Sequence, residues 1–183
     1  MKEKDYLEDI SGEIKEQYKT GVHKLERGEY QDAEKVFKDI IERQSDFVPA
    51  YNKLAIIKIY QGSLEEGGDW LKKALELDHE YAPAITNLGS IEKKRGDLEK
   101  AKQLYEKALN ADPKYGPAYN NLGVIYREQG DYARSVKFLK KASKLNSYTV
   151  DINQKSMSLK NPGCLMLIAI IIGAFILIYL WLQ

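Results

Sequence analysis

Four glycines divide most of the chain into units of equal length. Gly28, Gly62, Gly96 and Gly130 stand in the segments LERGEY, IYQGSL, EKRGDL and REQGDY, and each follows the previous one by 34 residues. Four further series of residues share this period. They are aromatic residues, prolines, leucines and alanines: Phe47/Tyr81/Tyr115, Pro49/Pro83/Pro117, Leu54/Leu88/Leu122 and Ala74/Ala108/Ala142. A fixed period of this length indicates a repeat architecture, in which each unit packs mainly against its neighbours.

The third unit indicates that each repeat folds as a pair of helices. Pro83 suits the first turn of a helix, because the N–H that proline lacks would be unpaired there. Apolar residues then recur at helical spacing as far as Ile91. Gly96 ends this helix and turns the chain, and a second apolar face continues to Ala108. A single hairpin cannot bury its apolar face, so neighbouring units must stack.

The pattern of small and large residues resembles the motif of the tetratricopeptide repeat family. In the third unit the motif is carried by Leu88-Gly89, Ala101, Tyr105, Ala108 and Pro113. The first unit departs from it at Thr20, where the family has leucine, and the second at Gly67, where it has alanine. Gly67-Gly68 is either a site of close packing beside a tolerated glycine or a point where the array flexes.

The resemblance predicts an all-α solenoid of four helix-hairpin repeats over residues 14–149. The predicted repeats are 14–47, 48–81, 82–115 and 116–149. An acidic segment, residues 1–13, precedes them and either extends the first helix backwards or forms a frayed tail. Residues 150–163 are predicted to be a polar linker.

The stretch 164–182, CLMLIAIIIGAFILIYLWL, contains no charged residue. Its last 18 residues would form a helix of about 27 Å, close to the roughly 30 Å hydrocarbon core of a bilayer. Tyr179 and Trp181 stand near its far end, where aromatic side chains settle at the membrane interface. The stretch therefore predicts one C-terminal transmembrane helix.

The charges near this stretch indicate an orientation. Lys155 and Lys160 precede it and only Gln183 follows it, so the chain is similar to tail-anchored proteins with a cytoplasmic N-terminal portion. The last repeat and the linker are also rich in lysine, and an anionic leaflet would attract these cations. Alternatively, these lysines form an ordinary solvated face.

Composition argues against catalysis and against a nucleic-acid partner. The 183 residues carry a formal net charge of +1 and contain one cysteine and two histidines. These residues supply no metal-ligand cluster and no Cys–His nucleophile, and the glycines form no phosphate-binding loop. We therefore predict that the chain is not an enzyme and has no metal or cofactor.

The family resemblance implies that the first helix of each repeat lines a concave groove. Asn87 and Asn121 occupy equivalent positions one repeat apart, and side-chain amides can hold a peptide backbone. In generic repeats the same asparagines often serve local bonding instead. The full set of predicted groove residues is Asn52, Asn87, Ser90, Lys93, Asn120, Asn121 and Arg127.

These observations predict a membrane-anchored scaffold or adaptor that binds a protein or peptide on the cytoplasmic side. Alternatively, the chain is an accessory or assembly subunit of a larger membrane complex. A third hypothesis is the recruitment of membrane-remodelling proteins, as in the mitochondrial fission receptor. The identity of the partner and the oligomeric state are not determined by the sequence.

Overall fold

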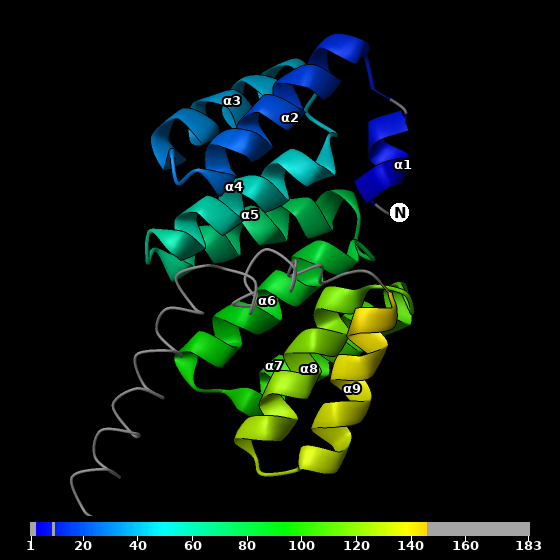
Figure 1. Cartoon of the computed structure of the whole chain (residues 1–183). Coiled ribbons are helices and arrows are strands. Elements are labelled where there is room, and N and C mark those ends of the chain that lie inside the picture. The colour runs from blue at the N-terminus through cyan, green and yellow to red at the C-terminus, as the bar shows by residue number, and fades with distance from the viewer. Residues whose placement is uncertain (1–2, 9, 146–183) are drawn as a thin grey trace, which may run out of the picture. The chain divides into compact units, whose positions relative to one another are not determined.

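The computed structural model describes residues 3–8 and 10–145, and every regular element within these ranges is an α-helix (Figure 1). The prediction of an all-α chain is thus confirmed for this part. The elements are α1 (Glu3–Glu8), α2 (Gly12–Glu26), α3 (Tyr30–Arg43), α4 (Val48–Tyr60), α5 (Leu64–Leu77), α6 (Ala82–Arg95), α7 (Leu98–Ala111), α8 (Gly116–Glu128) and α9 (Tyr132–Lys144).

The stretch predicted to cross a membrane, residues 164–182, lies outside the described residues. The predicted linker, with Lys155 and Lys160, lies outside them as well. Among the helices of the described ranges, none combines the length and the apolar character that a membrane span requires.

The helices α2 to α9 form four antiparallel hairpins that stack in chain order (Figure 1). Each hairpin pairs a first helix with a second helix, as α2 with α3 and α8 with α9. The second helix of each hairpin then packs against the first helix of the next, as α3 against α4 and α7 against α8. This nearest-neighbour packing confirms the predicted solenoid.

Local sequence sets the ends of these helices. A proline lies in the first turn of α4, α6 and α8, where it removes no intrahelical hydrogen bond. The four periodic glycines, Gly28, Gly62, Gly96 and Gly130, adopt φ values of 77°, 87°, 90° and 80°. A residue with a Cβ is strained in this left-handed conformation, so the period of glycines follows from the turn inside each hairpin.

Three buried clusters join neighbouring repeats. The first cluster lies around α2 to α4 and buries Phe37 with Phe47 and Leu54. The second lies between α4 and α6 and buries Tyr81. A third cluster around Tyr105 joins α6, α7 and α8. Burying each of these large side chains stabilises the fold by roughly 1.5–3 kcal/mol, so stability grows with every stacked repeat.

Close approach inside each hairpin depends on one small residue. A Cβ added at Gly89 of α6 would lie 2.6 Å from Cε1 of Tyr105 and 3.2 Å from the carbonyl oxygen of Ala101 on α7. In the second hairpin Ala55 takes the place of Gly89, and Gly67 on α5 takes the place of Ala101. A Cβ at Gly67 would meet Cγ1 of Ile59 at 2.9 Å.

The two adjacent glycines of α5 therefore differ. Gly67 is buried at the hairpin contact, whereas the nearest atom to a Cβ at Gly68 would be Cδ1 of Ile91 at an ordinary 3.9 Å. In this hairpin the alanine of the contact lies on the first helix, at Ala55, and the glycine lies on the second helix, at Gly67. Close packing thus explains Gly67, and Gly68 has no steric reason to be glycine.

Residues 3–8 of the acidic N-terminal segment form a separate short helix, α1, and Ser11 caps the start of α2 after it. On α1, the Tyr6 ring packs edge-on against Phe47 and Tyr81, with centroids 6.4 and 5.7 Å apart. Its hydroxyl donates a hydrogen bond to Oδ2 of Asp78 at 2.8 Å. Burial acts to raise the pKa of Asp78, but hydrogen bonds including that of Tyr6 outweigh it and lower the pKa.

Candidate functional site

The side chains of α2, α4, α6 and α8 that point away from the second helices form one surface, which we call the first-helix face. Lys53 of α4 lies 5.8 Å from the ring centroid of Tyr18 on α2. Nδ2 of Asn87 on α6 donates to Oδ1 of Asn52 on α4 at 2.8 Å. These contacts link α2 to α4 and α4 to α6.

A further contact joins α6 to α8. Lys93 Nζ lies 2.8 Å from Oε1 of Glu128, and the two side chains are 29% and 42% exposed. The charge of Lys93 is therefore compensated within the protein. A ligand that used this lysine would have to compete with the carboxylate.

Two of the predicted groove asparagines are brought together by the structure. Asn52 is only 2% exposed and joins two helices through its bond with Asn87. Asn87 is half-buried and uses one amide hydrogen in this bond, while its carbonyl oxygen has no hydrogen-bond partner among the described residues. Asn87 therefore keeps an acceptor at the surface, whereas Asn52 is covered.

The predicted residues on α8 are more accessible than those on α4. Asn120 and Asn121 are half-buried and Arg127 is exposed. None of the three has a hydrogen-bond or ion-pair partner within the described part of the chain. Two amides and one guanidinium are thus presented by a single helix.

Ser90 lies between these two sets and bonds within the protein. Its hydroxyl donates to the carbonyl oxygen of Thr86 at 3.1 Å and lies 3.4 Å from the hydroxyl of Tyr105. Burial of Tyr105 raises the pKa of its phenol, and the hydrogen bond with Ser90 only partly offsets this effect. Ser90 therefore lies on the first-helix face, but its hydroxyl is already used by contacts with Thr86 and Tyr105.

An apolar hollow occupies the other end of the first-helix face, between α2 and α4. Its volume is about 550 Å³, and Tyr60, 63% exposed, is the largest side chain open to solvent there. The rings of Tyr60 and Tyr30 lie with centroids 6.0 Å apart. We call this space the apolar hollow after its apolar residues Val22, Leu25 and Ile56 and its two tyrosines, Tyr30 and Tyr60. The rest of its lining is Gly28 and three charged residues, Glu26, Arg27 and Lys53.

Sequence reasoning did not single out the apolar hollow, although its signal was present. Ser90 stands in the third repeat where Ile56 stands in the second and Val22 in the first. Moving Ser90 and Lys93 back by the period of 34 residues gives apolar residues in the first two repeats, whereas moving Asn87 back gives Lys53 and Lys19. The sequence therefore contained a signal for an apolar patch with lysines beside it.

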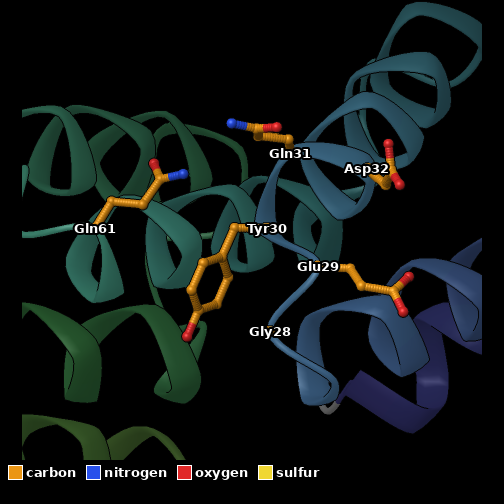
Figure 2. A pocket seen from close by; sticks show the side chains of 6 residues that line it. All are labelled: Gly28, Glu29, Tyr30, Gln31, Asp32 and Gln61. Atoms are coloured by element: carbon orange, nitrogen blue, oxygen red, sulfur yellow. The ribbon is translucent and has the colours of Figure 1, made fainter.

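A smaller pocket of about 290 Å³ lies at the hairpin turns beside the hollow. Glu29 and Asp32 lie on one side of the Tyr30 ring and Gln61 on the other (Figure 2). The carboxylate of Glu29 is paired with Arg27 at 2.9 Å and with Lys24 at 3.3 Å. Because its carboxylate is already compensated, this pocket gives no separate indication of a ligand.

Trp70 lies on the opposite side of the array from the first-helix face. It is half-buried, packs against two core clusters, and has Lys73 Nζ 4.4 Å from its ring centroid. A hollow of about 440 Å³ there is also lined by Tyr51 and Leu77. Packing between repeats accounts for Trp70.

Comparisons with known proteins agree with this architecture. A family profile described as "Tetratricopeptide repeat" matches residues 46–114 and 81–147, which together span more than half of the chain. No curated protein sequence matches the chain.

Solved structures are similar in fold. The crystal structure of MamA is 26% identical, with a TM-score of 0.56 over 79% of this chain and 84% of that chain. A thermophilic TPR protein of Thermus thermophilus is 20% identical, with a TM-score of 0.63 over 72% of this chain and 74% of that one. PilF of Pseudomonas aeruginosa is 21% identical, with a TM-score of 0.62 over 73% and 61% of the two chains. The two last similarities show the fold alone.

Proposed function

Because the chain belongs to the tetratricopeptide repeat family, we propose that it is an adaptor that binds a peptide segment of a partner protein on its first-helix face. A helix over residues 164–182 anchors it in a membrane, with the repeats on the cytoplasmic side. The observation that carries the binding proposal is that the first-helix face contains both the apolar hollow and the amides of Asn120 and Asn121, which have no partner among the described residues.

The two ends of the face suit different parts of an extended segment. An apolar side chain of the partner fits the hollow beside Ile56 and Tyr60, where burial supplies affinity. Asn87 and Asn121 can accept from and donate to its main chain, which gives hydrogen bonds without much sequence preference. The cation of Arg127 favours an acidic residue or a terminal carboxylate at that end.

The length of the segment follows from the spacing of the helices. Neighbouring packed helices lie about 8–10 Å apart, so the face from α2 to α8 measures roughly 25–30 Å. An extended chain advances about 3.3 Å per residue, and roughly eight or nine residues span the face. The proposal is therefore for a short linear segment, with its apolar residue near the end opposite its acidic residue.

The membrane part of the proposal rests on the uncharged stretch 164–182. Its test is extraction of membranes from cells that express the full chain. The full chain should resist alkaline carbonate and dissolve in detergent, and a variant lacking residues 164–182 should appear in the soluble fraction. Release of the full chain by carbonate would contradict the anchor.

The binding part is tested with a displayed library of random peptides, selected against the full chain in detergent micelles. Selected peptides are expected to share an apolar residue and to lose affinity about tenfold or more with Asn87→Ala, Asn121→Ala and Arg127→Ala together. The matched control replaces three exposed polar residues of α7 in the same way: Gln103→Ala, Glu106→Ala and Lys107→Ala. If both triple variants bind alike, the first-helix face is not the binding site.

A second candidate function is that of a subunit in a larger membrane complex. The observation that favours it is the outer side of α9, where Tyr132 and Val136 are 68% and 50% exposed. In that case the Asn87, Asn121 and Arg127 variants should leave the complex intact. Replacing residues 164–182 with an unrelated apolar helix should dissociate it instead.

A further inference from the structure

The last second helix differs in charge from those before it. α9 carries five cations and no carboxylate, whereas α5 carries four carboxylates and two lysines. α3 and α7 also contain residues of both signs. Position in the array alone does not require this difference, because all four are second helices of the same fold.

One position of each second helix faces the next repeat. It holds Glu34 on α3, which bonds Lys58 of α4 at 3.1 Å. On α5 it holds Gly68, whose nearest neighbour would be Ile91 of α6. On α7 it holds Lys102, only 24% exposed. On α9 the same position holds Val136, which is 50% exposed because no further repeat follows among the described residues.

Five of the exposed residues of α9 lie on one side of the helix. At 100° per residue, Tyr132, Val136, Lys140, Lys144 and Lys137 lie within an arc of about 140°, opposite the buried Ser135 and Ala142. The arc contains no carboxylate. We call these five residues the outer face of α9.

Two other cations of α9 are engaged within the protein. Arg134 pairs with Asp131 and lies 4.4 Å from the Tyr126 ring centroid, and Lys141 lies 4.3 Å from that of Tyr119. The cations of the outer face, Lys137, Lys140 and Lys144, have no ion-pair partner in the described part of the chain. Three uncompensated positive charges thus flank two exposed apolar groups.

We propose that the outer face of α9 rests on the anionic headgroups of the membrane that holds the chain. This inference depends on the anchor at 164–182 and specifies how the array is held against the bilayer. Each cation brought close to an anionic leaflet strengthens the attraction about fivefold. Tyr132 and Val136 add the apolar contact that lets a basic helix settle at the interface.

The covalent connection makes a lipid surface the favoured occupant over a soluble acidic partner. Nineteen residues, 145–163, separate α9 from the start of the uncharged stretch. Fully extended, they reach at most about 65 Å. The outer face of α9 therefore stays within about 65 Å of the anchor. This raised local concentration of the membrane adds to each weak contact.

Lysine footprinting of the full chain tests this arrangement. The protein is incorporated into nanodiscs of neutral phosphatidylcholine alone or with 30% phosphatidylserine, labelled briefly with acetic anhydride, and analysed by mass spectrometry. Labelling at Lys137, Lys140 and Lys144 is expected to be at least threefold slower in the anionic discs. The difference should disappear in 0.5 M salt, where charges at a surface are strongly screened.

The same molecule contains matched controls. Lys35, Lys72 and Lys107 are exposed on α3, α5 and α7, and their labelling should differ less than 1.5-fold between the two discs. A Tyr132→Ser and Val136→Ser variant should lose at least half of the protection while still entering the discs.

Two results would overturn the proposal. Equal labelling of the three α9 lysines in both discs, with the chain stably incorporated, would exclude the lipid contact and point to an acidic protein as the occupant. Failure of the full chain to enter the discs would remove the anchor as well, so the two failures are distinguishable.

Discussion

The first two repeats and the last two build the first-helix face from different chemistry on the same backbone. Ile56 and Ser90 occupy equivalent positions, as do Tyr60 and Lys94. The first pair of repeats therefore encloses an apolar hollow, and the second presents amides and cations. A repeat constrains the residues that pack between helices and leaves its open face free to differ, so binding preferences are set where the periodicity is weakest.

One of the four hairpins reaches the same helix packing by a different route. The first, third and fourth hairpins place the glycine on the first helix, at Gly21, Gly89 and Gly123, whereas the second places it on the second helix, at Gly67. The backbones approach closely in each case. The comparison shows that the hairpin requires one missing Cβ at the contact and accepts it from either helix.

The largest expected effect comes from adding a Cβ at the helix contact of the third hairpin. Gly89→Ala should lower the free energy of unfolding by about 1–3 kcal/mol, because its Cβ would lie 2.6 Å from the buried ring of Tyr105. Urea denaturation of the full chain in detergent measures the change. Wild-type stability in this variant would mean that the hairpin opens easily and that the glycine is dispensable.

Placing the polar residue of the third repeat at the equivalent position of the second repeat is expected to weaken peptide binding. Ile56→Ser gives the second repeat the residue of the third and should weaken a selected peptide about tenfold, since the lost apolar contact contributes on the order of 1–2 kcal/mol. Fluorescence anisotropy with the labelled peptide measures it. Ile41→Ser, which removes the same side chain on the opposite side, should bind normally; an equal loss there would indicate a general effect of destabilisation.

The adjacent glycine should respond with the opposite sign. Gly68→Ala is expected to raise the free energy of unfolding by roughly 1 kcal/mol, because alanine favours helix and its Cβ has ordinary space beside Ile91. Gly67→Ala is the control and should destabilise. Should both substitutions act alike, the assignment of close packing to Gly67 alone would be wrong.

The smallest effect concerns the ion pair between Glu34 and Lys58 at the first repeat boundary. The hydrogen bond from Lys38 lowers the pKa of Glu34; burial opposes this, and Lys58 adds to it. Burial also acts to lower the pKa of Lys58, but Glu34 outweighs it and the pKa is raised. A carboxyl with a lowered pKa adds stability above its unfolded value near 4.5, and this is lost as the pH falls through the folded value.

Between pH 7 and pH 3.5 the free energy of unfolding should therefore fall less in the Glu34→Gln variant than in the wild type. The difference between the two falls is expected to be up to about 1 kcal/mol. Urea denaturation at the two pH values measures the difference. Glu42→Gln, at an exposed carboxylate of the same helix without an ion-pair partner in the described residues, should behave like the wild type. Identical pH profiles for all three proteins would remove Glu34 as a source of pH dependence.

The fold was predictable because its determinants are local and repeated. The positive-φ glycines, the prolines at helix starts and the apolar spacing each follow from one residue and its neighbours in the chain. The candidate site was predictable only in part. Arg127 is exposed and Asn121 is half-buried, whereas Asn52 is covered because it bonds with Asn87, which is 35 residues away.

By itself, the sequence determined a stack of helix hairpins with a fixed period, because turn chemistry and apolar spacing act within each unit. Only the tertiary structure decided which polar residues remain available. Lys93 is paired with Glu128 on another helix, Ser90 is bound inside its own hairpin, and Tyr60 is left open beside the hollow. Such outcomes depend on distances between helices, inside one hairpin for Ser90 and a whole repeat apart for Lys93, and no local pattern encodes those distances.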